Sequence, residues 1–308
     1  EDASRQVQHM QKALSQMNVN LHIAISDITG VTGMRILQDI LHGERDPWKL
    51  AAHRDGRIKC SEETLVKALT GDYRPEHLFA LKQAFDTWRF YQQQIAECDE
   101  QLAAHMATFN SKLPADPPAL SLSTKHKTKP RRNEPKFALR EELHRILGVD
   151  LTRIDGVYVT TVQTVIAEIG TDMNRFPSEK HLGSWLGLAP HPQITGGKVV
   201  SSRTRHVANA AADALRMAAQ ALGRRNTALG AFYRRLRARL GPAKANTATA
   251  YKLARLIYCG IKYGQIYIDQ GAQYYNERYR QHILASLVRR AKEIGCSLVE
   301  NQTGTVLG

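Results

Sequence analysis

The chain has 308 residues, of which 43% are hydrophobic, a proportion that excludes an intrinsically disordered protein. It contains no run of about eighteen apolar residues, which excludes a membrane-spanning helix. The net charge of +14 and the isoelectric point near 9.7 favour a polyanionic partner, either nucleic acid or an acidic membrane surface.

Four isolated cysteines provide no zinc or disulfide motif. Cys60, Cys98, Cys259 and Cys296 lack CxxC or CxxH spacing, and we expect them to be buried small side chains in a reducing environment. The amino-terminal sequence EDASRQVQHMQKAL is polar and amphipathic, unlike a signal segment. It does not begin with Met, so we expect the chain to be part of a longer one.

The first predicted helix lies within residues 1–24. An apolar stripe at alternating spacings of three and four residues indicates it, formed by Val7, Met10, Leu14, Met17 and Leu21.

A longer stripe predicts a helix of about 35 residues over 75–110, with Pro75 near its first turn. The apolar positions are Leu78, Leu81, Phe85, Trp88, Tyr91, Ile95, Cys98, Leu102 and Met106. Its length favours a coiled-coil arm or dimerisation helix, although a helix packed on its own neighbours would show a similar pattern.

Residues 114–135, PADPPALSLSTKHKTKPRRNEP, contain five prolines and few apolar residues. This composition predicts a flexible linker, whose basic run either touches nucleic acid or is simply solvated. We therefore expect the following division of the chain: a helical, coiled-coil region at 1–112, a flexible Pro/Lys/Arg linker at 113–135, a nucleophile and nucleic-acid-binding domain at 136–268, and a carboxy-terminal helix and tail at 269–308.

Beyond the linker, apolar periodicity predicts helices near 136–147, 159–169, 178–187, 207–222, 227–240, 246–264 and 270–295. Glycines at or near their ends fit helix carboxy-terminal caps, namely Gly148, Gly170, Gly223, Gly241 and Gly264. Strand signals are scarce. The predicted fold class is mainly α, with a long coiled-coil-like helix followed by a helical domain.

A faint internal repeat relates residues 26–50 to residues 152–176. Both contain an apolar-x-Gly-apolar sequence that leads into a helix, which is the shape of a helix-hairpin-helix turn. In that motif the glycine lets backbone N–H groups approach a phosphate. Gly156 is the stronger candidate for contact with a DNA backbone, and Gly30 the weaker.

The charge is concentrated in one part of the chain. From Lys198 to Lys262 there are fourteen Lys or Arg residues and one acid, Asp213, which gives +13 in about one fifth of the sequence. The helices near 227–240 and 246–264, with the residues between them, supply much of it, through Arg234, Arg235, Arg237, Arg239, Lys244, Lys252 and Arg255. With Phe232, Leu236 and Leu240 facing a core, these cations would bind phosphates without reading bases.

The stretch PQITGGKVVSSRTRHVANAA, residues 192–211, combines hydroxyls, two glycines and cations. Thr195, Ser201 and Ser202 are candidate nucleophiles. Gly196 and Gly197 would let the backbone come close to a phosphate. Lys198, Arg203 and Arg205 would hold its non-bridging oxygens, as hydroxyl attack on DNA requires. The same stretch could equally be a surface connector, and His206 could accept a proton or merely pack.

Two other routes to DNA cleavage have little support in the sequence. The acids lie in helical or turn contexts and do not form the carboxylate cluster of a two-metal nuclease. The tyrosines between Tyr258 and Tyr279 are not preceded by the His-x-x-Arg pair of a tyrosine recombinase, and an aromatic helix face accounts for them.

Residues 150–265 resemble the carboxy-terminal domain of bridge-RNA-guided, DEDD-type insertion-sequence transposases, relatives of the pilin-gene invertases. The similarity lies in IDGVYVTTVQTVIAEIG, in RFPSEKHLGSWLGLAPHPQITGGKVVSS with the alanine-rich segment after it, and in AKANTATAYKLARLIY. The upstream SDITGVTGM and ALTGDYRPEHLFAL resemble the coiled-coil region of the same group, so the resemblance covers nearly the whole chain.

The resemblance implies a bacterial, cytoplasmic, nucleoid-associated recombinase whose serine joins covalently to DNA and whose guide RNA selects donor and target. It also implies a RuvC-like amino-terminal domain with four acidic ligands for Mg²⁺, which we expect to be absent from this chain; no cofactor is expected here. The family serine falls on Thr195, a stiffer β-branched alcohol. Ser201 or Ser202 could serve instead, or the copy could be inactive.

Three hypotheses follow. In the first, the chain is the nucleophile-bearing and DNA-binding part of a transposase, paired as a dimer or tetramer through the helix at 75–110. In the second, it is a non-catalytic DNA- or RNA-binding and dimerisation module. In the third, it is a transposase remnant that only dimerises.

Overall fold

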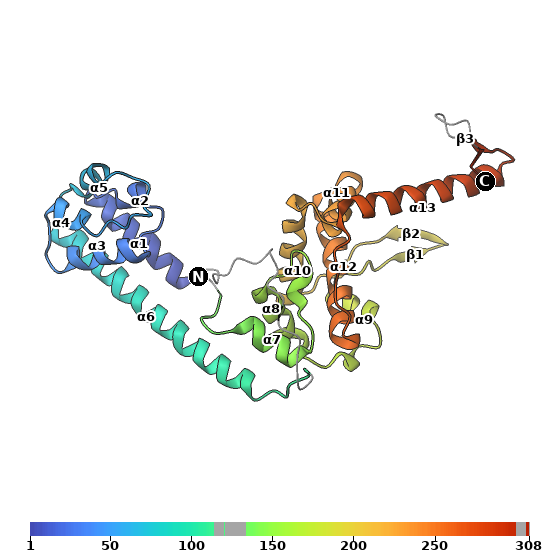
Figure 1. The fold of residues 1–308 in the computed structure, drawn as a ribbon, viewed down its shortest axis with the longest axis horizontal. Helices are drawn as coiled ribbons and strands as arrows, with labels where there is room; N and C mark the ends of the chain where they lie inside the picture. Colours follow the sequence, from blue (N-terminus) through green and yellow to red (C-terminus); the bar gives the residue numbers. More distant parts are fainter. Residues whose placement is uncertain (114–119, 121–133, 300–305, 308) are drawn as a thin grey trace. The chain divides into compact units, whose positions relative to one another are not determined.

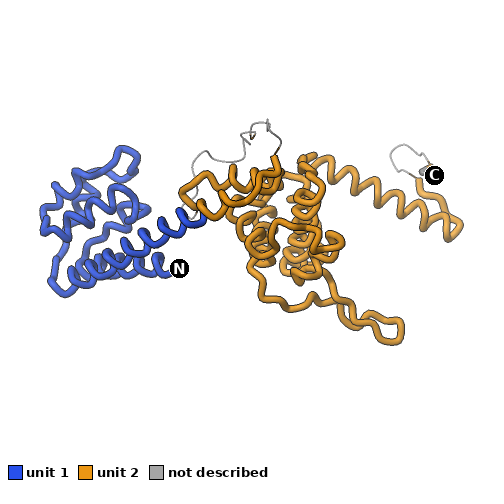
Figure 2. Tube along the Cα trace, turned by 90° about the horizontal axis from the view of Figure 1, so that it is seen from below, with its two compact units in different colours: residues 1–102 blue, residues 103–308 orange. Residues whose placement is uncertain are grey.

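The computed structural model describes residues 1–113, 120, 134–299, 306 and 307, so the predicted linker falls almost entirely outside the described residues. The chain forms two compact units, residues 1–102 and 103–308 (Figure 2). The described residues are mainly helical, which confirms the predicted fold class (Figure 1).

The first unit is built from α1 (Asp2–Gln16), α2 (Leu21–Ala24), α3 (Val31–Leu41), α4 (Pro47–Ala51), α5 (Glu62–Leu69) and the first part of α6 (Pro75–Ala107). The predicted stripe at 1–24 is confirmed, because Met10, Leu14, Met17 and Leu21 are fully buried. It spans two helices rather than one. The chain turns at Asn18, whose φ of 56° lies in the left-handed region that asparagine tolerates better than most residues.

The long helix predicted at 75–110 is confirmed as α6, which ends at Ala107. Leu81 and Phe85 are buried in the core of the first unit. Further along, the apolar side chains lose this cover, and Phe90 and Ile95 are 56% and 45% exposed. A coiled-coil partner for this part of α6 therefore stays a prediction.

The expectation of buried cysteines is wrong for two of the four. Cys98 on α6 and Cys296 near the carboxy terminus are exposed, and Cys60 and Cys259 are half-buried. The two helices that lead to Cys98 and Cys296 extend away from the cores, so apolar spacing there does not produce burial.

The helices of the second unit agree closely with the predicted segments. They are α7 (Leu139–Leu147), η1 (Leu151–Arg153), α8 (Val159–Ile169), η2 (Met173–Arg175), α9 (Glu179–Trp185), α10 (Ala210–Ala221), η3 (Leu222–Arg224), α11 (Ala228–Leu240), α12 (Pro242–Tyr263) and α13 (Gly271–Glu293). Short strands β3 (Leu298–Val299) and β4 (Val306–Leu307) pair at the end of the chain. Gly148 and Gly264 adopt the left-handed conformation at helix ends, as predicted.

Helix α12 is the centre of the second unit and packs against α9, α10 and α11. Its inner face, which includes Leu253, Ile257 and Tyr258, is buried. The Tyr258 hydroxyl donates a hydrogen bond of 3.0 Å to the Phe176 carbonyl, so the ring is both packed and satisfied.

Arg145 on α7 holds the chain that leaves α6. Its guanidinium donates hydrogen bonds to the carbonyls of Met106 (2.8 Å) and Phe109 (2.6 Å). The Lys112 N–H in turn donates to the Arg145 carbonyl at 2.9 Å. The segment 106–112 is therefore fixed to α7 by three hydrogen bonds that involve one residue.

The turn at Gly156, predicted to contact a DNA backbone, packs on α10. Gly156 has φ +81°, and a Cβ placed on it would lie 2.9 Å from the Ala218 carbonyl oxygen and 3.0 Å from Leu222. Close packing between the turn and α10 is thus a sufficient reason for glycine at this position. Contact with DNA stays a prediction.

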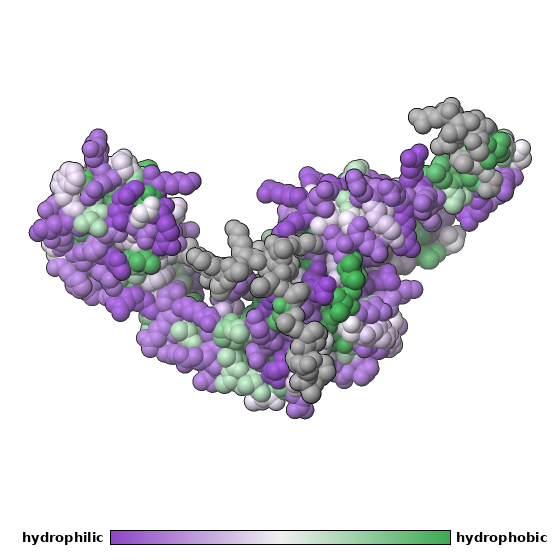
Figure 3. All heavy atoms as spheres, in the orientation of Figure 1, coloured by the Kyte–Doolittle hydropathy of each residue, from purple (hydrophilic) through white to green (hydrophobic). Residues whose placement is uncertain are grey.

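Helix α13 packs against α11 at its start and then extends away from the other helices of its unit (Figures 1 and 2). Ala272 is its one buried residue. Hydrophobic side chains gather at its far end, where Ile294 is 76% exposed, while most of the visible surface is hydrophilic (Figure 3).

Candidate nucleic-acid interface

The stretch predicted as a loop contains a β-hairpin that projects from the second unit (Figures 1 and 2). Strands β1 (Gln193–Thr195) and β2 (Lys198–Ser201) are antiparallel and joined by Gly196 and Gly197. Their φ values of +56° and +77° are those of a type I′ turn, which matches the twist of a hairpin. The positive φ values therefore require these glycines, since nothing lies within 4 Å of either Cβ position.

The register divides the hairpin side chains between two faces. Thr195 pairs with Lys198 beside the turn, and Ile194 pairs with Val199. Because side chains alternate along a strand, the first pair lies on one face and the second on the other. A β-bulge then pairs Gln193 with Ser201 and makes Val200 the additional residue.

The root of the hairpin is fixed by backbone pairing and by Arg205. Pro190 and Thr204 form a β-bridge, and the His191 N–H donates to the Arg203 carbonyl at 3.1 Å. The Arg205 guanidinium donates to the Ser184 carbonyl on α9 at 2.9 Å. The hairpin thus projects from an anchored base.

Helix α9, which leads into the hairpin, is seated on α12 through a glycine. A Cβ placed on Gly183 would lie 2.2 Å from Cε2 of Tyr251, so only glycine lets the ring pack at this distance. The carboxylate of Glu179 accepts a 3.0 Å hydrogen bond from Arg255, which ties the start of α9 to the same helix.

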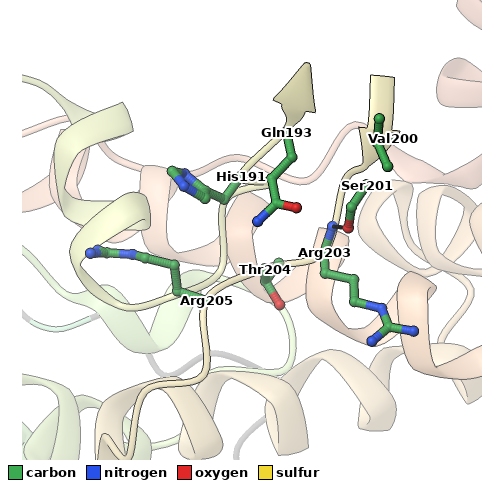
Figure 4. A pocket seen from close by; sticks show the side chains of 7 residues that line it. All are labelled: His191, Gln193, Val200, Ser201, Arg203, Thr204 and Arg205. Atoms are coloured by element: carbon green, nitrogen blue, oxygen red, sulfur yellow. Dashed lines mark hydrogen bonds between the residues drawn. The ribbon is translucent and has the colours of Figure 1, made fainter. Parts of the chain in front are cut away.

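An open hollow of about 550 Å³ lies at the hairpin base (Figure 4). It is lined by His191, Gln193, Val200, Ser201, Arg203, Thr204 and Arg205. The Arg203 N–H donates to Ser201 Oγ at 3.4 Å. The structure therefore brings the predicted residues Ser201, Arg203 and Arg205 around one hollow.

The other predicted residues of the stretch lie elsewhere on the hairpin or next to it. Thr195, Gly196, Gly197 and Lys198 form its exposed tip, and the register places Thr195 and Lys198 on the same face as Gln193. Ser202 is exposed and does not line the hollow. His206 is exposed too.

The hairpin and its surroundings in sequence contain no acidic residue. Between Glu179 and Asp213 there is no Asp or Glu, whereas Lys198, Arg203 and Arg205 are all present and exposed. The local charge favours a polyanion whatever the state of the histidines.

The basic residues of α11 have two different surroundings. Arg234 donates to the Arg225 carbonyl at 2.6 Å, and the Arg235 guanidinium lies 3.7 Å from the centre of the Tyr279 ring. Both side chains thus have structural contacts as well as charge. Arg237 and Arg239 are exposed. The expectation that Leu240 faces a core is wrong, because it is 38% exposed at the helix end.

Helix α12 contributes Lys244 and Lys252, both exposed. The pKa of Lys252 is lowered, first because the surrounding chain removes part of its hydration, and second because Arg255 and Arg278 repel its charge. Lys252 and Arg255, in the middle of α12, and Arg278 on α13 therefore repel one another, and a bound anion would offset that repulsion.

No group of three or more His, Cys, Asp or Glu side chains among the described residues is arranged to hold a metal ion. The helices in the same part of the chain include none that is long and apolar enough to cross a membrane.

An exposed, acid-free hairpin that carries hydroxyls beside arginines, on a basic helical unit, favours a polyanion as the partner. Residues 150–234 match the model of the transposase IS116/IS110/IS902 family. The match runs from η1 into α11 and includes the whole hairpin and its hollow. It supports an insertion-sequence transposase, a function in DNA recombination and DNA as the partner. No curated protein and no solved structure gave a match.

Sequence reasoning missed the hairpin and the seating of α9. A two-residue Gly-Gly between the β-branched residues of QIT and KVV is a signal for a type I′ hairpin and would have predicted it. No local signal marks the contact of Gly183 with Tyr251, because the two residues are distant in sequence.

Proposed function

We propose that this chain carries the DNA-binding and hydroxyl-nucleophile portion of an insertion-sequence transposase and forms a covalent protein–DNA intermediate. The observation that supports this most strongly is that the segment matching the transposase family contains hydroxyls and arginines on one projecting, acid-free hairpin. Hydroxyl attack on a phosphodiester needs this combination of alcohol and cations.

In the proposed step, Thr195 Oγ1 attacks a backbone phosphorus atom and forms a new P–O bond. The bond from phosphorus to one sugar oxygen breaks, and that oxygen leaves with a proton. The threonine proton passes to an acceptor, for which the sequence offers His206, and the leaving sugar oxygen takes its proton from solvent. Lys198, opposite Thr195 beside the turn, holds a non-bridging oxygen, and Arg203 and Arg205 at the root of the hairpin offset the remaining phosphate charge.

Ser201 is the alternative nucleophile. It lies in the hollow next to Arg203 and Arg205, whereas Thr195 lies at the hairpin tip beside Lys198. The resemblance favours Thr195, and the arrangement of side chains around the hollow favours Ser201, so the experiment must separate them.

The remaining partners in the proposal are a guide RNA and further copies of the chain, paired as a dimer or tetramer through α6. The resemblance assigns Mg²⁺ to an acidic domain, and the described residues do not fit such a site.

The test is a search for covalent protein–DNA adducts. The full-length product of the gene is incubated with DNA and RNA corresponding to the sequences that flank the gene, and products are separated on denaturing gels. Thr195→Ala and Ser201→Ala are compared with wild type. Ser202→Ala is the matched control, since it removes a neighbouring hydroxyl outside the hollow.

Loss of adduct in Thr195→Ala alone would identify the threonine, and Thr195→Ser would then retain the adduct. Loss in Ser201→Ala alone would move the chemistry to the hollow. If wild type binds DNA and forms no adduct under any condition, the proposal fails, and a binding module without chemistry takes its place.

A further inference from the structure

The hairpin face opposite Thr195 and Lys198 carries an apolar pair with no protein beneath it. Ile194 and Val199 are directly opposed across the strands and are 62% and 61% exposed. In a sheet such a pair would normally pack on a core. Here the two-stranded ribbon projects from its unit, so the pair is available to a partner (Figure 2).

Charge complementarity selects the class of partner. The apolar pair lies in the acid-free stretch between Glu179 and Asp213, with Lys198 beside Val199 and with Arg203 and Arg205 at the root. A protein partner would need a strongly acidic surface to bind this basic hairpin, whereas every nucleic acid carries a negative charge on each phosphate. A two-stranded ribbon is also narrow enough to enter a DNA groove about 12 Å wide.

We propose that Ile194 and Val199 form an apolar wedge that contacts a disturbed base step of bound DNA, while the opposite face of the hairpin holds a phosphate. The inference rests on the proposed function, since it requires DNA on the hairpin. Apolar side chains inserted at a base step unstack it, which costs free energy. A step that is already unpaired has lost part of that stacking, so the wedge binds it more tightly.

The test compares two DNA probes with the full chain. One is a fluorescein-labelled duplex of mixed sequence, and the other is the same duplex with a central unpaired bulge. Affinities are measured by anisotropy over a range of salt concentrations. The Ile194→Thr/Val199→Thr variant keeps β-branched side chains and therefore the hairpin, and it removes the apolar surface. Val200→Thr is the matched control, because Val200 is even more exposed, at 70%, but lies outside the pair of Ile194 and Val199.

We expect wild type to bind the bulged duplex about ten-fold more tightly than the paired one, which corresponds to about 1.4 kcal/mol of unstacking that the bulge spares. The double variant should lose this preference while its affinity for the paired duplex and its salt dependence stay unchanged. Val200→Thr should keep the preference.

Equal affinity of wild type for both probes would overturn the wedge, as would a preference that survives in the double variant. A double variant that keeps the preference and changes its oligomeric state would identify a protein interface instead. Failure of wild type to bind either probe in a salt-dependent way would remove DNA binding, and thus the proposed function, before the wedge is in question.

Discussion

Gly183 allows α9, the helix that leads into the hairpin, to pack closely on α12. An alanine there would place its Cβ 2.2 Å from a ring carbon of Tyr251, so α9 would have to move away from α12. We expect Gly183→Ala to lower the free energy of unfolding by about 1–3 kcal/mol, the usual cost of overpacking. Urea unfolding followed by circular dichroism measures this.

The control for this substitution is Gly56→Ala, because Gly56 has open space around its Cβ position and no positive φ. It should change the free energy of unfolding by less than about 0.5 kcal/mol. Equal stability of the two variants would contradict the close packing of α9 on α12.

The pair of Arg140 and Asp150 makes the stability of the second unit depend on pH. Burial, the largest effect, raises the pKa of Asp150, but the hydrogen bonds from Arg140 and Thr152 outweigh it and the net pKa is lowered. A carboxylate with a lowered folded pKa stabilises above its unfolded value of about 4. That stabilisation is lost as the pH falls through the folded pKa.

Asp150→Asn should therefore cost about 3 kcal/mol at neutral pH, since it removes the carboxylate that pairs with the mostly buried Arg140 guanidinium. The difference in the free energy of unfolding between the variant and wild type should become smaller as the measurement is repeated down to about pH 3. Asp213→Asn, which removes an exposed partner of Arg216, should cost less than about 1 kcal/mol at any pH. If the difference between Asp150→Asn and wild type does not change with pH, the stabilising role of the ionised Asp150 is contradicted.

Among single residues, the sequence predicted those features that depend only on neighbouring residues in the chain. Gly148 and Gly264 are left-handed caps because a helix ends there, and Ser201, Arg203 and Arg205 lie around one hollow because they are neighbours in the chain. The packing of Gly156 on α10 depends on a residue far along the chain. The sequence alone therefore could not show that packing on α10 is a reason for glycine at this position.

At the scale of elements, α6 provides the sharpest prediction. Its apolar stripe continues past the core of the first unit, where Ile95 is 45% exposed. If the stripe pairs with another copy, Ile95→Lys should weaken self-association at least about ten-fold, because a charge would be buried at the seam. Sedimentation velocity over a concentration series measures the association.

Gln93→Lys is the matched variant, since it adds the same charge on the opposite side of α6, where Gln93 is exposed. It should leave self-association unchanged. A chain that is monomeric at all concentrations, or a Gln93→Lys variant as weak as Ile95→Lys, would remove α6 as the pairing element.

The helices were predictable as elements because periodicity and end signals are local. Helical spacing alone could not tell which part of α6 is covered, since Phe85 and Ile95 belong to the same stripe and only Phe85 is buried. The hairpin was not predicted, although its Gly-Gly turn is a hairpin signal. Both of its faces are exposed, so no alternation of buried and exposed residues marks its strands.

For the whole molecule, the concentration of charge between Lys198 and Lys262 predicts how binding responds to salt. Six phosphate contacts would give a slope of about −5 in log affinity against log salt. Arg203→Ala should reduce the slope by about 1 and weaken binding equally for all sequences. Titrations of a mixed-sequence duplex at several salt concentrations measure both, and weak binding with a flat salt response would indicate a remnant that only dimerises.

The hydrogen bonds of Arg145 have a consequence for the connectivity of the chain. They hold the segment 106–112 to α7, although many residues intervene in sequence between Lys112 and α7. A single proteolytic cut in that interval would leave two fragments that migrate together on a native gel and separate on a denaturing one.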